Sequence, residues 1–247
     1  MFIVRFALLS SFFYALNVSM LPLIYSFEVS AFLFLFIRFA TTFCSSLLVT
    51  KSFFSFTKIK KHKIGFWLII LSFLFGIQSW FFVEAVKYMS VGLASVILYT
   101  YPLITYLMVS LSKRRALDLT TIVMFIFATI GIVAISQSSE GVYMLVIGIL
   151  LSLLSAISLS LIFFLTPKVR SLRNWEIVKF TTLIPMLMFL ALFLNESGIS
   201  WPASEGIILS LISGTLFASG MFFYHIAVRR YGPTRTANVG YSEPLMV

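Results

Sequence analysis

The residues best placed to do chemistry in this 247-residue chain are two charges embedded in apolar stretches, Glu243 and Arg38. A charge at the centre of a membrane helix costs about 2.5–3.5 kcal/mol on insertion scales, so such a group usually faces a cavity or a partner. For Glu243, the functional interpretation is proton coupling or binding of a substrate amine. For Arg38, it is binding of a substrate carboxylate. The structural alternative is an ion pair between the two residues, or a protonated Glu243.

Three further side chains are candidates for the same site: Gln78, Trp80 and Tyr101. Aromatic faces attract cations, so Trp80 and Tyr101 could line a cavity for aromatic or cationic solutes. Aromatic residues make up 17% of the chain, however, and most rings are expected to pack against other helices or face lipid. Gln78 and Trp80 have the same alternative role as packing groups.

These residues must be positioned by helices that cross a membrane. Hydrophobic residues make up 60% of the chain, charged residues 11%, and the mean hydropathy is +1.06, which a soluble domain could not bury. A membrane helix needs about 20 apolar residues to cross a core of roughly 30 Å. The charge-free runs predict spans at 6–26, 30–50, 64–86, 91–111, 118–137, 142–165, 176–195 and 206–228, with a ninth beginning near Thr236.

An internal repeat organises these spans. The stretch Ala85–Leu103 returns as Ala227–Leu245 at an offset of 142 residues without a gap. Five spans separate the two copies, so the second enters the membrane upside down, a construction typical of secondary transporters. We therefore expect an all-α polytopic membrane protein with an inverted five-plus-five helix repeat and about eight and a half spans present. The units are 1–138 and 139–247, and we expect the second to be incomplete, as in a fragment or truncated product.

The repeat also ranks the tyrosines. Glu243 aligns with Tyr101, and Tyr241 aligns with Tyr99. At about 100° per residue, positions two apart lie on nearly opposite faces of a helix. If Glu243 avoids lipid, Tyr101 should face the cavity, whereas Tyr99 and Tyr241 should face neighbouring helices.

Prolines and small residues recur at the same offset. Pro102 and Pro244 each remove a backbone donor and clash with the preceding turn, so both helices should kink or unwind there as a shared hinge. The carbonyls released could contact substrate or be satisfied by adjacent helices. Small residues spaced by four allow close helix approach, and we assign four of them to helix packing: Ser72, Gly76, Gly214 and Ala218.

The distribution of lysine and arginine predicts the orientation. With the N-terminus in the cytoplasm, all of the 18 basic residues except Lys87 and Arg38 lie on the inner side. The net charge of +10 is spread over short loops, which argues for topology signals and contacts with anionic headgroups and against nucleic-acid binding. We expect a cytoplasmic or inner membrane location, with the lipid bilayer and a small-molecule substrate as partners, and a homodimer as a further expectation.

Enzymatic and metal chemistry find little support in the sequence. The single Cys44 excludes an intrachain disulfide, and His62 and His225 are too far apart in sequence to form a motif. No serine or threonine has a histidine and an acid at useful spacing. We expect no cofactor, no metal site and no enzyme activity.

The sequence resembles the drug/metabolite transporter superfamily, specifically its EamA-like ten-helix permeases, over essentially the whole chain. The matching motifs are Arg38–Phe39, Ala85–Tyr88, Ala94–Ser95, Tyr101–Pro102, Gly232–Arg235 and Glu243–Pro244. One departure follows helix four, where Lys113–Leu117 replaces the Glu-Arg pair common in the family. The resemblance implies five-plus-five inverted helices around a central cavity, and export or uptake of small metabolites such as amino acids, nucleosides or drugs. The alternative is a non-transporting membrane subunit or an inactive truncated permease.

Overall fold

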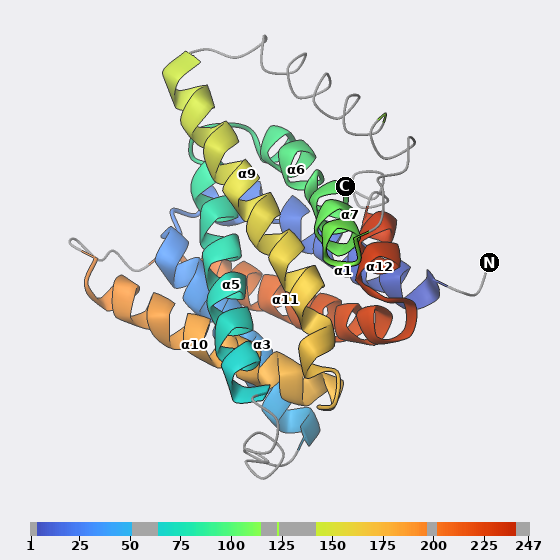
Figure 1. Cartoon of the computed structure of the whole chain (residues 1–247). Helices are drawn as coiled ribbons and strands as arrows, with labels where there is room; N and C mark the ends of the chain where they lie inside the picture. The colour runs from blue at the N-terminus through green and yellow to red at the C-terminus, as the bar shows by residue number, and fades with distance from the viewer. Residues whose placement is uncertain (1–3, 51–63, 115–122, 124–141, 197–201, 241–247) are drawn as a thin grey trace.

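The computed structural model describes residues 4–50, 64–114, 123, 142–196 and 202–240. Within these ranges the chain is helical and contains no strand. The helices are α1 (Arg5–Ser19), α2 (Leu21–Tyr25), α3 (Ala31–Thr50), α5 (Ile64–Ala85), α6 (Val91–Leu98), α7 (Tyr101–Ser112), α9 (Val142–Leu165), α10 (Asn174–Leu194), α11 (Ser204–Tyr231) and α12 (Pro233–Val239), with the 3-10 helix η2 at Thr166–Val169 (Figure 1).

Seven of the described segments are long and apolar enough to cross a membrane. They are Arg5–Tyr25, Ala31–Val49, Ile64–Ala85, Val91–Ser112, Leu145–Val169, Asn174–Leu194 and Ser204–Tyr231. These correspond to seven of the eight complete spans expected from hydropathy, which confirms the all-α polytopic membrane fold. The remaining expected span, 118–137, lies outside the described residues except for Val123. The start of the ninth span corresponds to α12, which begins at Pro233, three residues before the expected position.

Local sequence signals set several helix ends. The Ser90 hydroxyl accepts a hydrogen bond from the Leu93 backbone N–H at 3.3 Å and caps the start of α6. At the start of α10, the Glu176 carboxylate accepts from the Arg173 backbone N–H at 2.8 Å. Gly232 separates α11 from α12 at φ 83°, a left-handed conformation that glycine adopts without steric cost.

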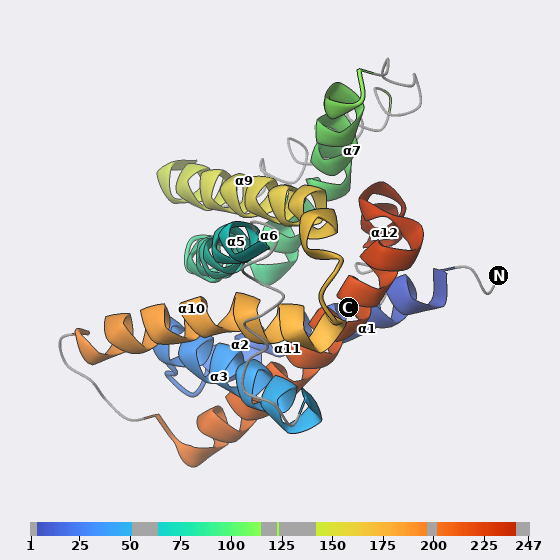
Figure 2. The ribbon, with the colours of Figure 1, turned by 60° about the horizontal axis from the view of Figure 1, so that its bottom comes forward.

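The helix contacts follow the offset of 142 residues. Adding 142 to the residue numbers of α3 and α5 gives 173–192 and 206–227, which closely match the ranges of α10 and α11. Adding 142 to those of α1 gives 147–161, which lies within α9. In the structure α5 packs against α9 and α10, while α11 packs against α1 and α3. The helices α3 and α10 are equivalent to each other in the two copies, and they lie side by side in the middle of the bundle (Figure 2). Equivalent helices of the two copies therefore make equivalent contacts.

Three of the four small residues assigned to packing, Ser72, Gly76 and Gly214, lie at these contacts. The Ser72 hydroxyl donates to the carbonyl of Phe180 on α10 at 2.9 Å, and a Cβ at Gly76 would lie 3.2–3.5 Å from Met188 and Pro185 of the same helix. A Cβ at Gly214 would lie only 2.7 Å from Thr41 Cβ on α3. Ala218 on α11 is buried. Small side chains thus permit close approach in both copies.

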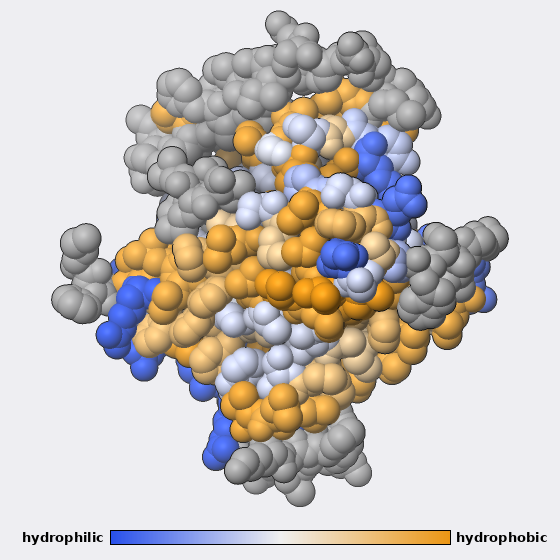
Figure 3. All heavy atoms as spheres, turned by 180° about the vertical axis from the view of Figure 1, so that it is seen from behind, coloured by the Kyte–Doolittle hydropathy of each residue, from blue (hydrophilic) through white to orange (hydrophobic). Residues whose placement is uncertain are grey.

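The outer surface is strongly apolar. Figure 3 shows hydrophobic residues over much of one face. Large exposed side chains include Leu48, Leu111 and Leu194, which are 79%, 73% and 64% exposed. A soluble monomer rarely exposes apolar patches this extensive, whereas a bilayer solvates them.

Candidate functional site

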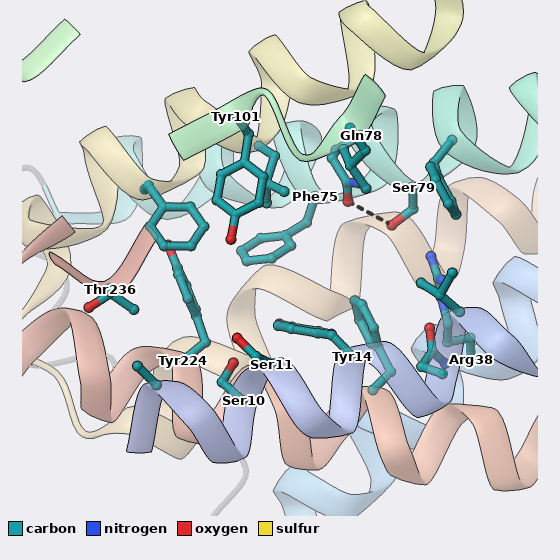
Figure 4. Close-up of a pocket in the computed structure, with 18 of the residues that line it drawn as sticks. Ser10, Ser11, Tyr14, Arg38, Phe75, Gln78, Ser79, Tyr101, Tyr224 and Thr236 are labelled. Carbon is teal, nitrogen blue, oxygen red and sulfur yellow. Dashed lines mark hydrogen bonds between the residues drawn. The ribbon is translucent and has the colours of Figure 1, made fainter. Parts of the chain in front are cut away.

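A cavity lies between helices of the first repeat copy and helices of the second. It encloses about 810 Å³ including its open part. Residues from α1, α3, α5, α7, α9, α11 and α12 line it, together with Leu21 of α2 and Leu98 of α6. In Figure 4, Arg38 lies at one end, and Tyr224 and Thr236 lie toward the other. The polar lining residues are Ser10, Ser11, Tyr14, Asn17, Arg38, Gln78, Ser79, Tyr101, Tyr224 and Thr236.

Arg38 is the charged residue among the described residues that line this cavity. Its side chain is 4% exposed, and its guanidinium carbon lies 5.2, 5.4 and 4.5 Å from the ring centroids of Phe34, Phe39 and Phe217. Aromatic faces stabilise a cation at these distances. Its Nε and Nη2 atoms have no hydrogen-bond partner in the described part of the chain. The site therefore holds a desolvated cation with hydrogen-bond donors available to a ligand.

One wall of the cavity is a polar stripe on α1 that the sequence analysis missed. Ser10, Tyr14 and Asn17 are spaced by four and three residues, which puts them on one helix face. The Asn17 amide donates to the carbonyl of Ser213 at 2.8 Å and to its hydroxyl at 2.6 Å. The Ser10 hydroxyl donates to the Gly220 carbonyl at 3.0 Å. The spacing of polar residues in an otherwise apolar helix was the signal that could have identified this wall.

Tyr101 and Gln78, both predicted to line a cavity, do so. The Tyr101 ring packs on Phe163 with centroids 5.1 Å apart. The backbone approaches closely here, because a Cβ at Gly240 would overlap the Tyr101 hydroxyl. Tyr99 is buried in the core and does not line the cavity, as the helix geometry predicted.

Gln78 and Trp80 face different surroundings although they are only two residues apart. The Gln78 side-chain amide nitrogen donates to the Ser155 hydroxyl at 3.1 Å, and this hydroxyl donates to the backbone carbonyl of Gln78 at 2.9 Å. This exchange fixes the amide on the cavity wall. Trp80 is 36% exposed, packs on Phe81 and does not line the cavity. Positions two apart on a helix differ by about 200°, so Gln78 and Trp80 cannot share a face, and Trp80 is not retained as a cavity residue.

The fourth span is interrupted next to Pro102, where a kink or local unwinding was expected. The α6 helix ends at Leu98, and α7 begins at Tyr101 with Pro102 as its second residue. The Thr100 backbone N–H donates to the Ile97 carbonyl, a tighter spacing than in an α-helix. The Tyr101 carbonyl accepts from the hydroxyls of Thr105 in α7 at 2.8 Å and Ser160 in α9 at 2.9 Å, so a hydrogen bond joins the break to a neighbouring helix. Motion at this break remains a prediction.

The remaining candidates, Glu243 and Pro244, lie outside the described residues, as does Tyr241. The acids within the described ranges do not line the cavity. The described residues also contain no group of three or more histidines, cysteines or acids that could hold a metal ion. The cavity chemistry visible here is therefore one cation, several hydroxyls and amides, and aromatic rings.

Comparison with known proteins gives a family for this arrangement. The model of the EamA-like transporter family matches residues 1–137, more than half of the 247 residues. The matched region contains Arg38, Gln78, Tyr101 and the polar stripe of α1. No curated protein is similar enough to the chain to be matched to it. The helices, the polar cavity between them and the family match agree, and the chain is a multi-pass membrane protein that belongs to the EamA-like transporter family.

Proposed function

We propose that this protein is a secondary transporter that carries a small solute bearing a carboxylate, such as an amino acid or a related amphipathic metabolite. The observation that carries the proposal is the buried Arg38 guanidinium, whose Nε and Nη2 atoms lack partners among the described residues and whose side chain lines the cavity. A guanidinium presents its N–H groups in a planar fork that matches a carboxylate. A bound carboxylate would supply both the missing hydrogen bonds and the missing negative charge.

The rest of the cavity suits the remainder of such a solute. Tyr101, Phe163 and Tyr224 provide packed rings on its wall away from Arg38, with Phe163 and Tyr224 centroids 4.7 Å apart. The hydroxyls and amides of α1 and α5 lie along the same cavity. A ligand with a carboxylate at one end and an apolar or aromatic body at the other would thus meet matching groups.

The coupling residue in this proposal is Glu243. Its support comes from the sequence repeat, in which Glu243 takes the position of the cavity-lining Tyr101. An acid at that position could carry a proton or bind the substrate amine. We place the protein in the cytoplasmic or inner membrane with its N-terminus in the cytoplasm, on the support of the lysine and arginine distribution.

The test is uptake by proteoliposomes that contain the whole chain. Each amino acid of a mixed panel is paired with its amide, which keeps the body of the solute and removes the carboxylate. We expect uptake of at least one amino acid and at least tenfold lower uptake of its amide. Arg38→Gln should abolish that difference, whereas Lys87→Gln, which removes an exposed cation outside the cavity, should preserve it. Equal uptake of acids and amides would refute the carboxylate assignment, and no uptake of any solute would favour a non-transporting membrane subunit.

A further inference from the structure

A second cavity lies where the α9–η2–α10 turn meets the α11–α12 turn. It encloses about 540 Å³ including its open part and shares no lining residue with the central cavity. The residues around it are Thr166, Pro167, Arg170, Ile177, His225, Val228, Arg229, Gly232 and Pro233. The positive-inside distribution predicts that this end of the bundle faces the cytoplasm.

His225 is a buried polar group of this cavity that no described residue satisfies. Its side chain is 2% exposed, and neither ring nitrogen has a hydrogen-bond partner within the described ranges. The ring packs edge-on against Tyr224 and Phe75, with centroids 4.8 and 6.3 Å away. In either neutral tautomer, one ring nitrogen is a donor and the other an acceptor. Because buried polar groups are almost always paired, the imidazole implies an occupant of the cavity.

Two arginines give the cavity its charge. The Arg229 Nη2 atom donates to the carbonyls of Arg170, at 2.7 Å, and Leu172, which ties its guanidinium to the turn before α10. These two bonds leave Nε and Nη1 for other contacts. Arg170 is exposed and also lines the cavity. Among the described residues no acid lines the cavity, so its charge is positive.

We propose that this cavity binds a phosphate group, with Arg170 and Arg229 contacting its oxygens and His225 donating from the base. Two guanidinium groups and an imidazole offer many directed N–H donors, which a phosphate group with several strong acceptor oxygens can accept. At the cytoplasmic interface, such a group occurs both in anionic lipid headgroups and in soluble phosphorylated compounds. The site is independent of the carboxylate proposal, because the two cavities share no residue.

The phosphate site is coupled structurally to the wall of the central cavity. Thr166 lines the phosphate site, and its hydroxyl is hydrogen-bonded to the Tyr224 hydroxyl at 2.8 Å. Tyr224 lines the central cavity, and the adjacent His225 lines the phosphate site. An occupant would therefore lie beside two residues, Thr166 and His225, that both contact Tyr224 of the central cavity.

The test measures binding to the purified whole chain in a neutral maltoside detergent by isothermal titration calorimetry. The probes are inorganic phosphate and dioctanoyl phosphatidic acid, with dioctanoyl glycerol as the matched lipid that lacks phosphate. The variants are His225→Phe, which keeps an aromatic ring, and Arg170→Gln at an exposed position. Arg230→Gln is the control, because it removes an exposed cation of the same helix end that does not line the site.

We expect phosphatidic acid to bind and dioctanoyl glycerol not to bind. His225→Phe and Arg170→Gln should each raise Kd by about tenfold, equivalent to about 1.4 kcal/mol, while Arg230→Gln changes it less than twofold. Binding of inorganic phosphate with the same variant pattern would identify soluble phosphate compounds as ligands, and binding of the lipid alone would identify headgroups. The proposal is overturned if neither phosphate probe binds, if the glycerol lipid binds equally, or if Arg230→Gln has the same effect as Arg170→Gln.

Discussion

Replacing Arg38 with methionine should separate substrate binding from folding. Methionine keeps an unbranched, flexible side chain, although a shorter one, and removes the charge and every donor. If Nε and Nη2 both contact a substrate carboxylate, the loss of two charge-assisted hydrogen bonds of about 1.5–3 kcal/mol each weakens binding by at least about 100-fold. Transport of the carboxylate solute should then fall by a comparable factor when the solute is well below its half-saturating concentration.

The free energy of unfolding should change far less. The substitution removes two buried donors without described partners, each of which costs about 1–3 kcal/mol when left unsatisfied. It also loses contacts of the guanidinium with three aromatic rings, worth about 1 kcal/mol each. The two effects oppose each other, so Arg38→Met should lower the free energy of unfolding by no more than about 1 kcal/mol and could raise it.

Two assays on the same preparation check this prediction: solute uptake in proteoliposomes and unfolding by denaturing detergent in mixed micelles. Arg38→Lys is the matched variant, because lysine keeps the charge but cannot contact a carboxylate with a planar fork. We expect its loss of affinity to be about tenfold, between wild type and methionine. The reasoning fails if Arg38→Met transports the solute with unchanged half-saturation, or if it unfolds so readily that lost uptake reflects a lost fold.

Two further predictions concern the contacts that position the cavity. Gly214→Ala should destabilise the protein by about 1–3 kcal/mol through overpacking, because its Cβ would lie 2.7 Å from Thr41. Gly92→Ala, in a helix with nothing within 4 Å of the new Cβ, should be neutral or slightly stabilising, and equal melting temperatures for the two variants would contradict the packing assignment. Asn17→Ala should lower the free energy of unfolding by about 0.6 kcal/mol and at most by about 1.7 kcal/mol, because it removes an amide that donates twice to Ser213. These values are typical of hydrogen bonds between membrane helices. A much larger decrease in the free energy of unfolding, measured in mixed micelles, would show that Asn17 does more than join α1 to α11.

The sequence alone determined the class of protein and the order of its spans. Apolar length decides whether a segment can cross a bilayer, and that length is written directly in the chain. The offset of 142 residues also related helices whose contacts match in the structure, such as α5 with α10 and α11 with α3. Arg38 stood out for the same reason, since a charge within a membrane span is costly wherever the helices pack.

Only the tertiary structure decided which face of each helix points inward. Helix periodicity shows which residues share a face, but lipid is as apolar as the protein interior, so hydrophobicity does not say which face is buried. The sequence could therefore not place Gln78 on the cavity and Trp80 on the outside. His225 belongs to no sequence motif. It gained its interpretation because η2, α10 and α11 meet at its cavity and leave both its ring nitrogens without a described partner.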